Sequence, residues 1–60
     1  MKNYRVISNS YLIGYFNTAE EAEKSAKECK KFALIEKKVE YDGREYWSIV
    51  GNNEIGIRKV

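Results

Sequence analysis

The pair Asp42-Gly43 lies between two runs that are rich in aliphatic and aromatic residues, 33–41 and 44–50. Asp-Gly is a strong signal for a type I′ turn, because this turn needs a positive φ at both of its central residues. We therefore predict a β-hairpin over residues 33–50. A fixed turn also fixes the strand register, and the register decides which side chains share a face of the sheet.

Three further strands are indicated by the same β-forming residue types. Residues 4–8 alternate and are followed by a possible turn at Asn9-Ser10, and residues 11–16 form the second run. Near the C-terminus, residues 51–54 are rich in glycine and asparagine, which tolerate positive φ, so we expect a turn before a last strand over 55–60. The C-terminal half is thus predicted to be a three-stranded meander.

A helix is predicted to begin at Thr18, where Thr-Ala-Glu-Glu forms a capping box with Glu21. We expect it to continue to about Lys31. Small side chains recur along one stripe of this helix, so its axis can lie close to a sheet. The stripe consists of Ala19, Ala22, Ala26, Cys29 and Ala33.

These elements predict an α+β fold, a small single domain over residues 1–60 with the order β-β-α-β-β-β. It would have a mostly antiparallel sheet with one helix packed on one face. The chain has no proline and no internal repeat, so no linker is indicated. The two N-terminal strands carry apolar residues on both faces, and one short helix cannot cover both. Either the sheet curls into a partial barrel, or a second copy or another protein covers the remaining apolar side chains, and we favour a homodimer.

The predicted register divides the side chains between two faces. One face would be apolar and would pair Ile35 with Val50, Val50 with Ile55, and Ser48 with Ile57. The apolar set is Ile35, Val39, Tyr46, Val50, Ile55 and Ile57.

The opposite face would hold Trp47 between two cations, Lys38 and Arg58. Such a tryptophan either makes a local cation–π contact or anchors a partner. Our candidate partner-binding residues are Trp47, Lys38, Arg58, Ile49 and Arg44. The alternative is a longer loop with a bulge at Gly43, which would turn Trp47 toward the core.

Catalysis is the least favoured class of function. The chain has no histidine, its one cysteine, Cys29, lies in the alanine stripe, and its sole aspartate, Asp42, belongs to the predicted turn. No pair of carboxylates has the spacing of a catalytic dyad, so we expect no catalytic residues, no metal site and no cofactor. The N-terminal residues lack the apolar stretch of a signal peptide and no run reaches membrane-spanning length, so we expect a cytoplasmic protein without a membrane partner.

Residues 11–22, Tyr-Leu-Ile-Gly-Tyr-Phe-Asn-Thr-Ala-Glu-Glu-Ala, resemble the strand-to-helix junction of plant ethylene-response-factor and integrase-type DNA-binding domains. Sporulation-related peptidoglycan-binding domains have similar junctions. Ile13 is inserted relative to the DNA-binding pattern, and in those families the sheet precedes the helix, so no base-reading residue carries over. The resemblance and the aromatic residues keep a small nucleic-acid-binding domain, using sheet aromatics with lysine and arginine, as the alternative function.

The leading hypothesis is a non-enzymatic protein-interaction module that binds a protein partner through an exposed sheet face. Aromatic anchors inside a polar rim of both signs are typical of modest protein interfaces. A net charge of only +2 would attract the phosphates of a nucleic acid weakly. Small size and a composition rich in lysine and asparagine favour a bacterial or phage accessory protein of the inhibitor type.

Overall fold

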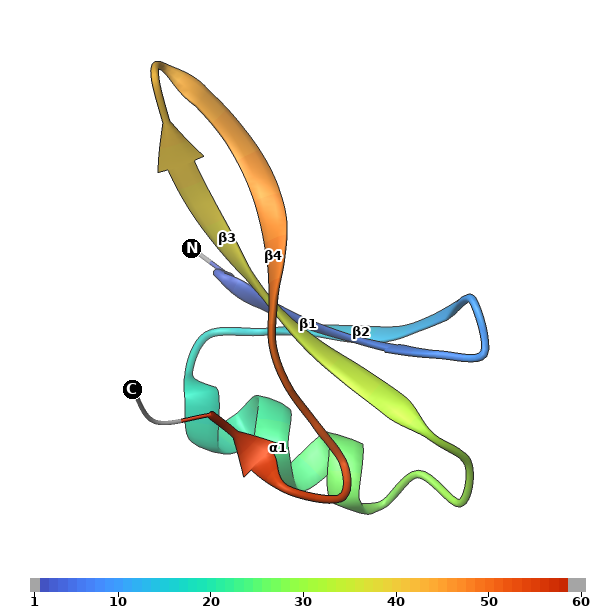
Figure 1. The fold of residues 1–60 in the computed structure, drawn as a ribbon. Helices are drawn as coiled ribbons and strands as arrows, with labels where there is room; N and C mark the ends of the chain where they lie inside the picture. The colour runs from blue at the N-terminus through green and yellow to red at the C-terminus, as the bar shows by residue number, and fades with distance from the viewer. Residues whose placement is uncertain (1, 59–60) are drawn as a thin grey trace.

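The computed structural model describes residues 2–58 as five strands and one helix (Figure 1). In chain order these are β1 (Tyr4–Ser8), β2 (Tyr11–Phe16), α1 (Ala19–Lys27), β3 (Ala33–Tyr41), β4 (Arg44–Asn52) and β5 (Gly56–Ile57). The expected strand over 55–60 is much shorter than predicted, and residues 59 and 60 lie outside the described part. Among the described residues, no helix has the length and apolar character needed to cross a membrane.

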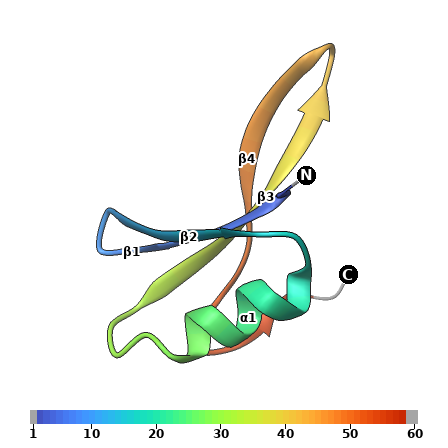
Figure 2. The ribbon, with the colours of Figure 1, turned by 180° about the vertical axis from the view of Figure 1, so that it is seen from behind.

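All five strands belong to one antiparallel sheet with the order β2-β1-β3-β4-β5. The N-terminal strands form a hairpin that joins the meander through β1, which pairs with β3. Helix α1 lies on one side of the sheet, and the far end of the β3–β4 hairpin extends away from it (Figures 1 and 2). The predicted α+β fold, with its element order and one helix on one face of an antiparallel sheet, is confirmed.

Both predicted hairpin turns have two residues with positive φ. The values are 53° at Asp42 and 75° at Gly43, and 50° at Asn9 and 68° at Ser10. This is the type I′ geometry, which matches the right-handed twist of the flanking strands. The alternative with a longer loop at Gly43 is therefore wrong.

Helix α1 begins as predicted but ends one turn earlier than Lys31. The hydroxyl of Thr18 accepts a hydrogen bond from the backbone N–H of Glu21 at 3.2 Å, and it donates to the Glu21 carboxylate at 3.1 Å. The carbonyl of Lys31 accepts from the Asn53 side chain instead of continuing the helix. The same Asn53 side chain accepts from the N–H of Ala33, so it ties the helix-to-β3 loop to the end of β4.

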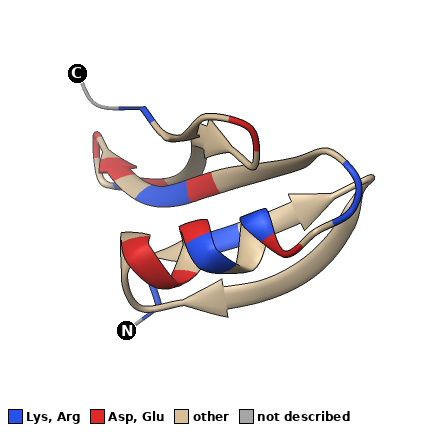
Figure 3. Ribbon diagram, turned by 90° about the horizontal axis from the view of Figure 1, so that it is seen from below, with Lys and Arg blue, Asp and Glu red and all other residues tan. Residues whose placement is uncertain are grey.

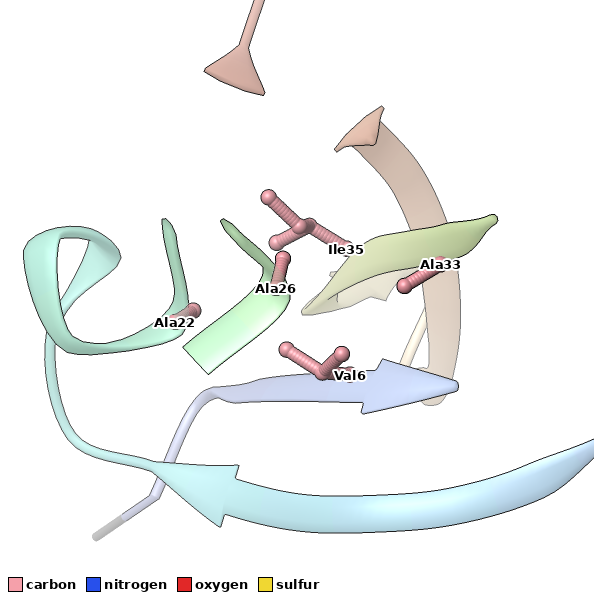
Figure 4. Close-up of a cluster of buried hydrophobic side chains, with 5 residues drawn as sticks. All are labelled: Val6, Ala22, Ala26, Ala33 and Ile35. Atoms are coloured by element: carbon pink, nitrogen blue, oxygen red, sulfur yellow. The ribbon is translucent and has the colours of Figure 1, made fainter. Parts of the chain in front are cut away.

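The core lies where α1 crosses β1 and β3 (Figure 4). Its fully buried members are Val6, Ala22, Ala26, Ala33 and Ile35. The predicted contact of the helix through its alanines and Cys29 is confirmed, because Cys29 packs against this cluster. Small helix residues and larger strand residues thus share the interior, as dense packing requires.

The predicted apolar face is only partly correct. Tyr46 and Ile55 are 48% and 63% exposed, so neither belongs to the core. The helix has nine residues and is about 13.5 Å long, which is too short to cover the outer half of the hairpin. Tyr46 lies opposite Val39 as predicted, but that pair is only three positions from the Asp42-Gly43 turn at the outer end of the hairpin.

A bulge in β4 accounts for one wrong register prediction at its C-terminal end, and the length of the following turn accounts for the others. The pairing shifts between Ile35 and Glu36, so Ile35 lies opposite Gly51 rather than Val50. Strand β5 then pairs Ile57 with Gly51, not with Ser48, and the predicted pair of Val50 with Ile55 does not form. The turn before β5 spans residues 53–55, which is longer than a two-residue turn at Asn52-Asn53, and this longer turn places β5 beside Gly51 and Asn52, away from Trp47.

Candidate partner-binding face

We use the term open face for the side of the sheet that points away from α1. Strand alternation and register assign its residues, because directly paired residues lie on the same face. They are Arg5, Ile7, Leu12, Tyr15, Leu34, Glu36, Lys38, Glu40, Glu45, Trp47 and Ile49.

Trp47 lies at the centre of three side-chain contacts on this face. The Cζ atom of Arg5 is 4.4 Å from the centroid of the indole ring, and the Nζ atom of Lys38 is 5.4 Å from it. The ring of Tyr15 lies 5.9 Å away, centroid to centroid, at an interplanar angle of 42°. Both distances from the cations lie within the range of cation–π attraction. The indole is therefore held by residues from β1, β2 and β3 although it belongs to β4.

Glu36 positions the guanidinium that lies over the indole. The Nε atom of Arg5 donates to Oε1 of Glu36 at 2.5 Å, and the two residues pair directly across β1 and β3. Their side chains are 26% and 15% exposed, so solvent screens the pair in part. The pair orients Arg5 more than it stabilises the fold.

Exposed apolar side chains lie around this cluster, and no other described element of the chain covers them. Ile49 is 60% exposed, Leu12 48% and Tyr15 45%, and Trp47 is partly buried by its cations. Exposed apolar groups gathered on one face are more informative than the same residues scattered singly. The open face therefore combines an ordered aromatic centre with apolar residues that water still reaches.

The charges of the open face nearly cancel. Arg5 and Lys38 supply two positive charges, whereas Glu36, Glu40 and Glu45 supply three negative ones. Glu40 and Glu45 lie directly opposite each other near the hairpin tip, where like charges are destabilising. This face is thus weakly negative despite the positive charge of the chain.

Of the five predicted binding residues, the structure brings three together. Trp47 and Lys38 are paired across the hairpin as predicted, and Ile49 lies on the same face. The placement of Arg58 opposite Trp47 is wrong, because the turn at 53–55 shifts β5 along β4 and the N–H of Arg58 donates to the carbonyl of Val50. Arg44 pairs with Tyr41 on the opposite face of the hairpin, so it does not join the cluster.

Two important members of the cluster, Arg5 and Tyr15, were not identified from the sequence. Both come from the N-terminal hairpin, and they reach Trp47 because β1 docks beside β3. No local signal in the sequence indicates that β1 pairs with β3. One signal was available: Arg5 interrupts an otherwise uncharged strand, as a residue with a specific partner often does.

Comparisons with protein-family models, curated proteins and solved structures found no match to this chain.

Proposed function

We propose that this chain is a non-enzymatic interaction module whose open face binds a protein partner. The observation that supports this most directly is the Trp47 cluster, an aromatic centre held by two cations and a tyrosine and bordered by exposed Ile49. Tryptophan, tyrosine and arginine are the residue types most enriched among binding hot spots. The cluster contains all three.

The side chains of the Trp47 cluster are also fixed in place before any partner binds, and this favours binding. Arg5 is held by Glu36, and the Trp47 ring is contacted by side chains from three other strands. A side chain already fixed in the free protein loses less conformational entropy when a partner covers it. The open face is therefore preorganised for contact.

The charges indicate the chemistry of the partner. Glu40 and Glu45 oppose each other beside the aromatic cluster, and a basic group on the partner would relieve their repulsion. We accordingly propose a partner surface with an apolar centre and a lysine or arginine near the hairpin tip. A small chain that binds in this way can block or adapt a larger protein, which is the behaviour of a bacterial or phage accessory protein acting in the cytoplasm.

The test compares what three immobilised forms of the chain retain from a lysate of its source organism, with quantitative mass spectrometry as the readout. Trp47→Ala removes the centre of the open face. Tyr41→Ala is the matched control, because Tyr41 is 72% exposed and lies on the opposite face of the same hairpin. We expect proteins retained by the wild type and by Tyr41→Ala to be lost with Trp47→Ala. Equal retention by all three forms would contradict the proposal.

Binding of single-stranded nucleic acid is the second candidate. The pairing of Tyr15 and Trp47 with two nearby cations resembles the stacking platforms that accept bases. The three glutamates of the open face oppose phosphate binding, which ranks this function lower. Titration with a fluorescent oligonucleotide at several salt concentrations tests it. Saturable binding that weakens steeply with salt and is lost in Trp47→Ala would favour nucleic acid over protein.

A further inference from the structure

Strand β2 forms one edge of the sheet and is unusual in its lack of charge. Residues 6–19 contain no lysine, arginine, aspartate or glutamate, although the whole chain has 11 basic and 9 acidic residues. The β1–β2 hairpin is accordingly tan beyond its first residues in Figure 3, whereas blue and red segments follow one another along α1. Edge strands of stable monomers commonly carry lysine or other charges that prevent further pairing. Strand β2 has no such protection.

The same strand exposes much apolar surface. Tyr11 is 73% exposed, Leu12 48%, Ile13 47% and Tyr15 45%. In the sheet order β2 has only β1 as a neighbour, so its outer backbone groups point to solvent. An uncharged apolar strand with an open edge can add to another strand by main-chain hydrogen bonds.

A bulge in β2 determines which partner strand fits. The register with β1 shifts between Val6 and Ile7, which leaves Ile13 without an opposite residue. Leu12 and Tyr15 therefore both lie on the open face, although three positions separate them. Because of the same bulge, Tyr11 and Phe16 both lie on the helix side of the sheet, where they pair with Ser8 and Tyr4.

The geometry points to β2 of a second copy as the occupant of this edge. Directly opposed residues in an antiparallel pair must lie on the same face of the sheet. One register of β2 against itself meets this condition throughout: it pairs Leu12 with Tyr15 on the open face and Tyr11 with Phe16 on the helix side. If this register moves by one residue in either direction, Leu12 lies opposite Gly14 or Phe16, and both of these lie on the helix side.

The central pair of this register is Ile13 of one copy opposite Gly14 of the other. A large side chain thus faces a glycine, and both bulges lie at the two-fold axis. The pairing is isologous, so it closes on itself and gives a dimer rather than a fibre. It joins two five-stranded sheets into one and places both open faces on the same side, so each copy keeps its open face accessible to a partner.

Charge favours a second copy over a charged peptide. A two-fold axis brings identical residues close together, which costs nothing where no residue carries a charge. The outer edge of β4 is different, because Arg44 and Glu45 lie on it beside the hairpin turn. Six residues per strand give a small interface of the class found in weak, reversible complexes.

Sedimentation equilibrium over a wide concentration range tests the dimer. We expect the mass to rise from one chain to two as the concentration increases. Ile13→Lys should weaken association at least about tenfold, because it places two lysines at the axis. Ile55→Lys is the matched control, since Ile55 is 63% exposed in the turn before β5, and it should associate like the wild type. A monomer at every concentration, or equal weakening by both variants, would overturn the proposal.

A cross-linking experiment tests the register without relying on a destabilised variant. Two chains are prepared in a Cys29→Ser background, one with Leu12→Cys and the other with Tyr15→Cys. Opposed residues have Cβ atoms roughly 4.5–5.5 Å apart, whereas a three-residue offset separates them by about 10 Å. Mild oxidation should therefore cross-link the mixture at least several-fold faster than either chain alone. Faster cross-linking of a single chain type would overturn this register.

Discussion

Replacing Ile35 with alanine should remove much of the stability of this protein. Ile35 is fully buried, and with Val6 it is one of the two largest side chains that are completely enclosed. The substitution removes three buried carbon atoms, which at roughly 0.8 kcal/mol each corresponds to about 2.4 kcal/mol of lost transfer free energy. The remaining cavity raises the expected loss to about 3–4 kcal/mol, within the range found for such changes.

That loss is large for a chain of 60 residues, whose total free energy of unfolding should be roughly 3–9 kcal/mol. Urea denaturation, followed by circular dichroism, gives the measurement. Ile55→Ala is the control with identical chemistry at an exposed site, and it should change the free energy of unfolding by less than about 0.5 kcal/mol. A loss below about 1 kcal/mol for Ile35→Ala, or equal losses for the two variants, would refute the placement of the core.

Three other substitutions test particular backbone and charge features, each by its thermal midpoint. Ser10→Gly should stabilise the protein by about 0.5–1 kcal/mol, because serine has a φ of 68° there; a lower midpoint would contradict the type I′ turn. Gly51→Ala should cost about 1–3 kcal/mol, since its Cβ atom would lie 2.7 Å from Cα of Ile57; an unchanged midpoint would contradict the close approach of β5. Glu45→Lys should raise the midpoint slightly by removing the repulsion from Glu40, an effect of roughly 0.2–1 kcal/mol that high salt should reduce.

The local elements could be predicted because their signals are local. Two-residue turns at Asn9-Ser10 and Asp42-Gly43, and the cap at Thr18, each depend on a few adjacent residues. The strand bounds of β1, β2 and β3 follow directly from these turns. The pair of Lys38 with Trp47 was also predictable, because it is close to the hairpin turn that sets its register.

The long-range features could not be predicted from the pattern. The bulges beside Ile13 and Val50 leave no mark in the alternation of apolar residues, yet each one reverses the faces of the residues beyond it. The error at Arg58 follows from the turn at 53–55, whose length the glycine and asparagine residues around it do not fix. The role of Arg5 depends on the docking of β1 against β3, a contact between segments 31 positions apart.

The placement of Trp47 on the open face is the central claim, and the unfolding free energy of Trp47→Ala tests it most directly. On this face the indole contributes two cation–π contacts and one aromatic pair, so its loss should cost about 1.5–3 kcal/mol and leave the circular dichroism spectrum folded. An unfolded spectrum, or a loss of about 3–5 kcal/mol as for a core tryptophan, would place Trp47 in the interior and contradict the proposed binding face.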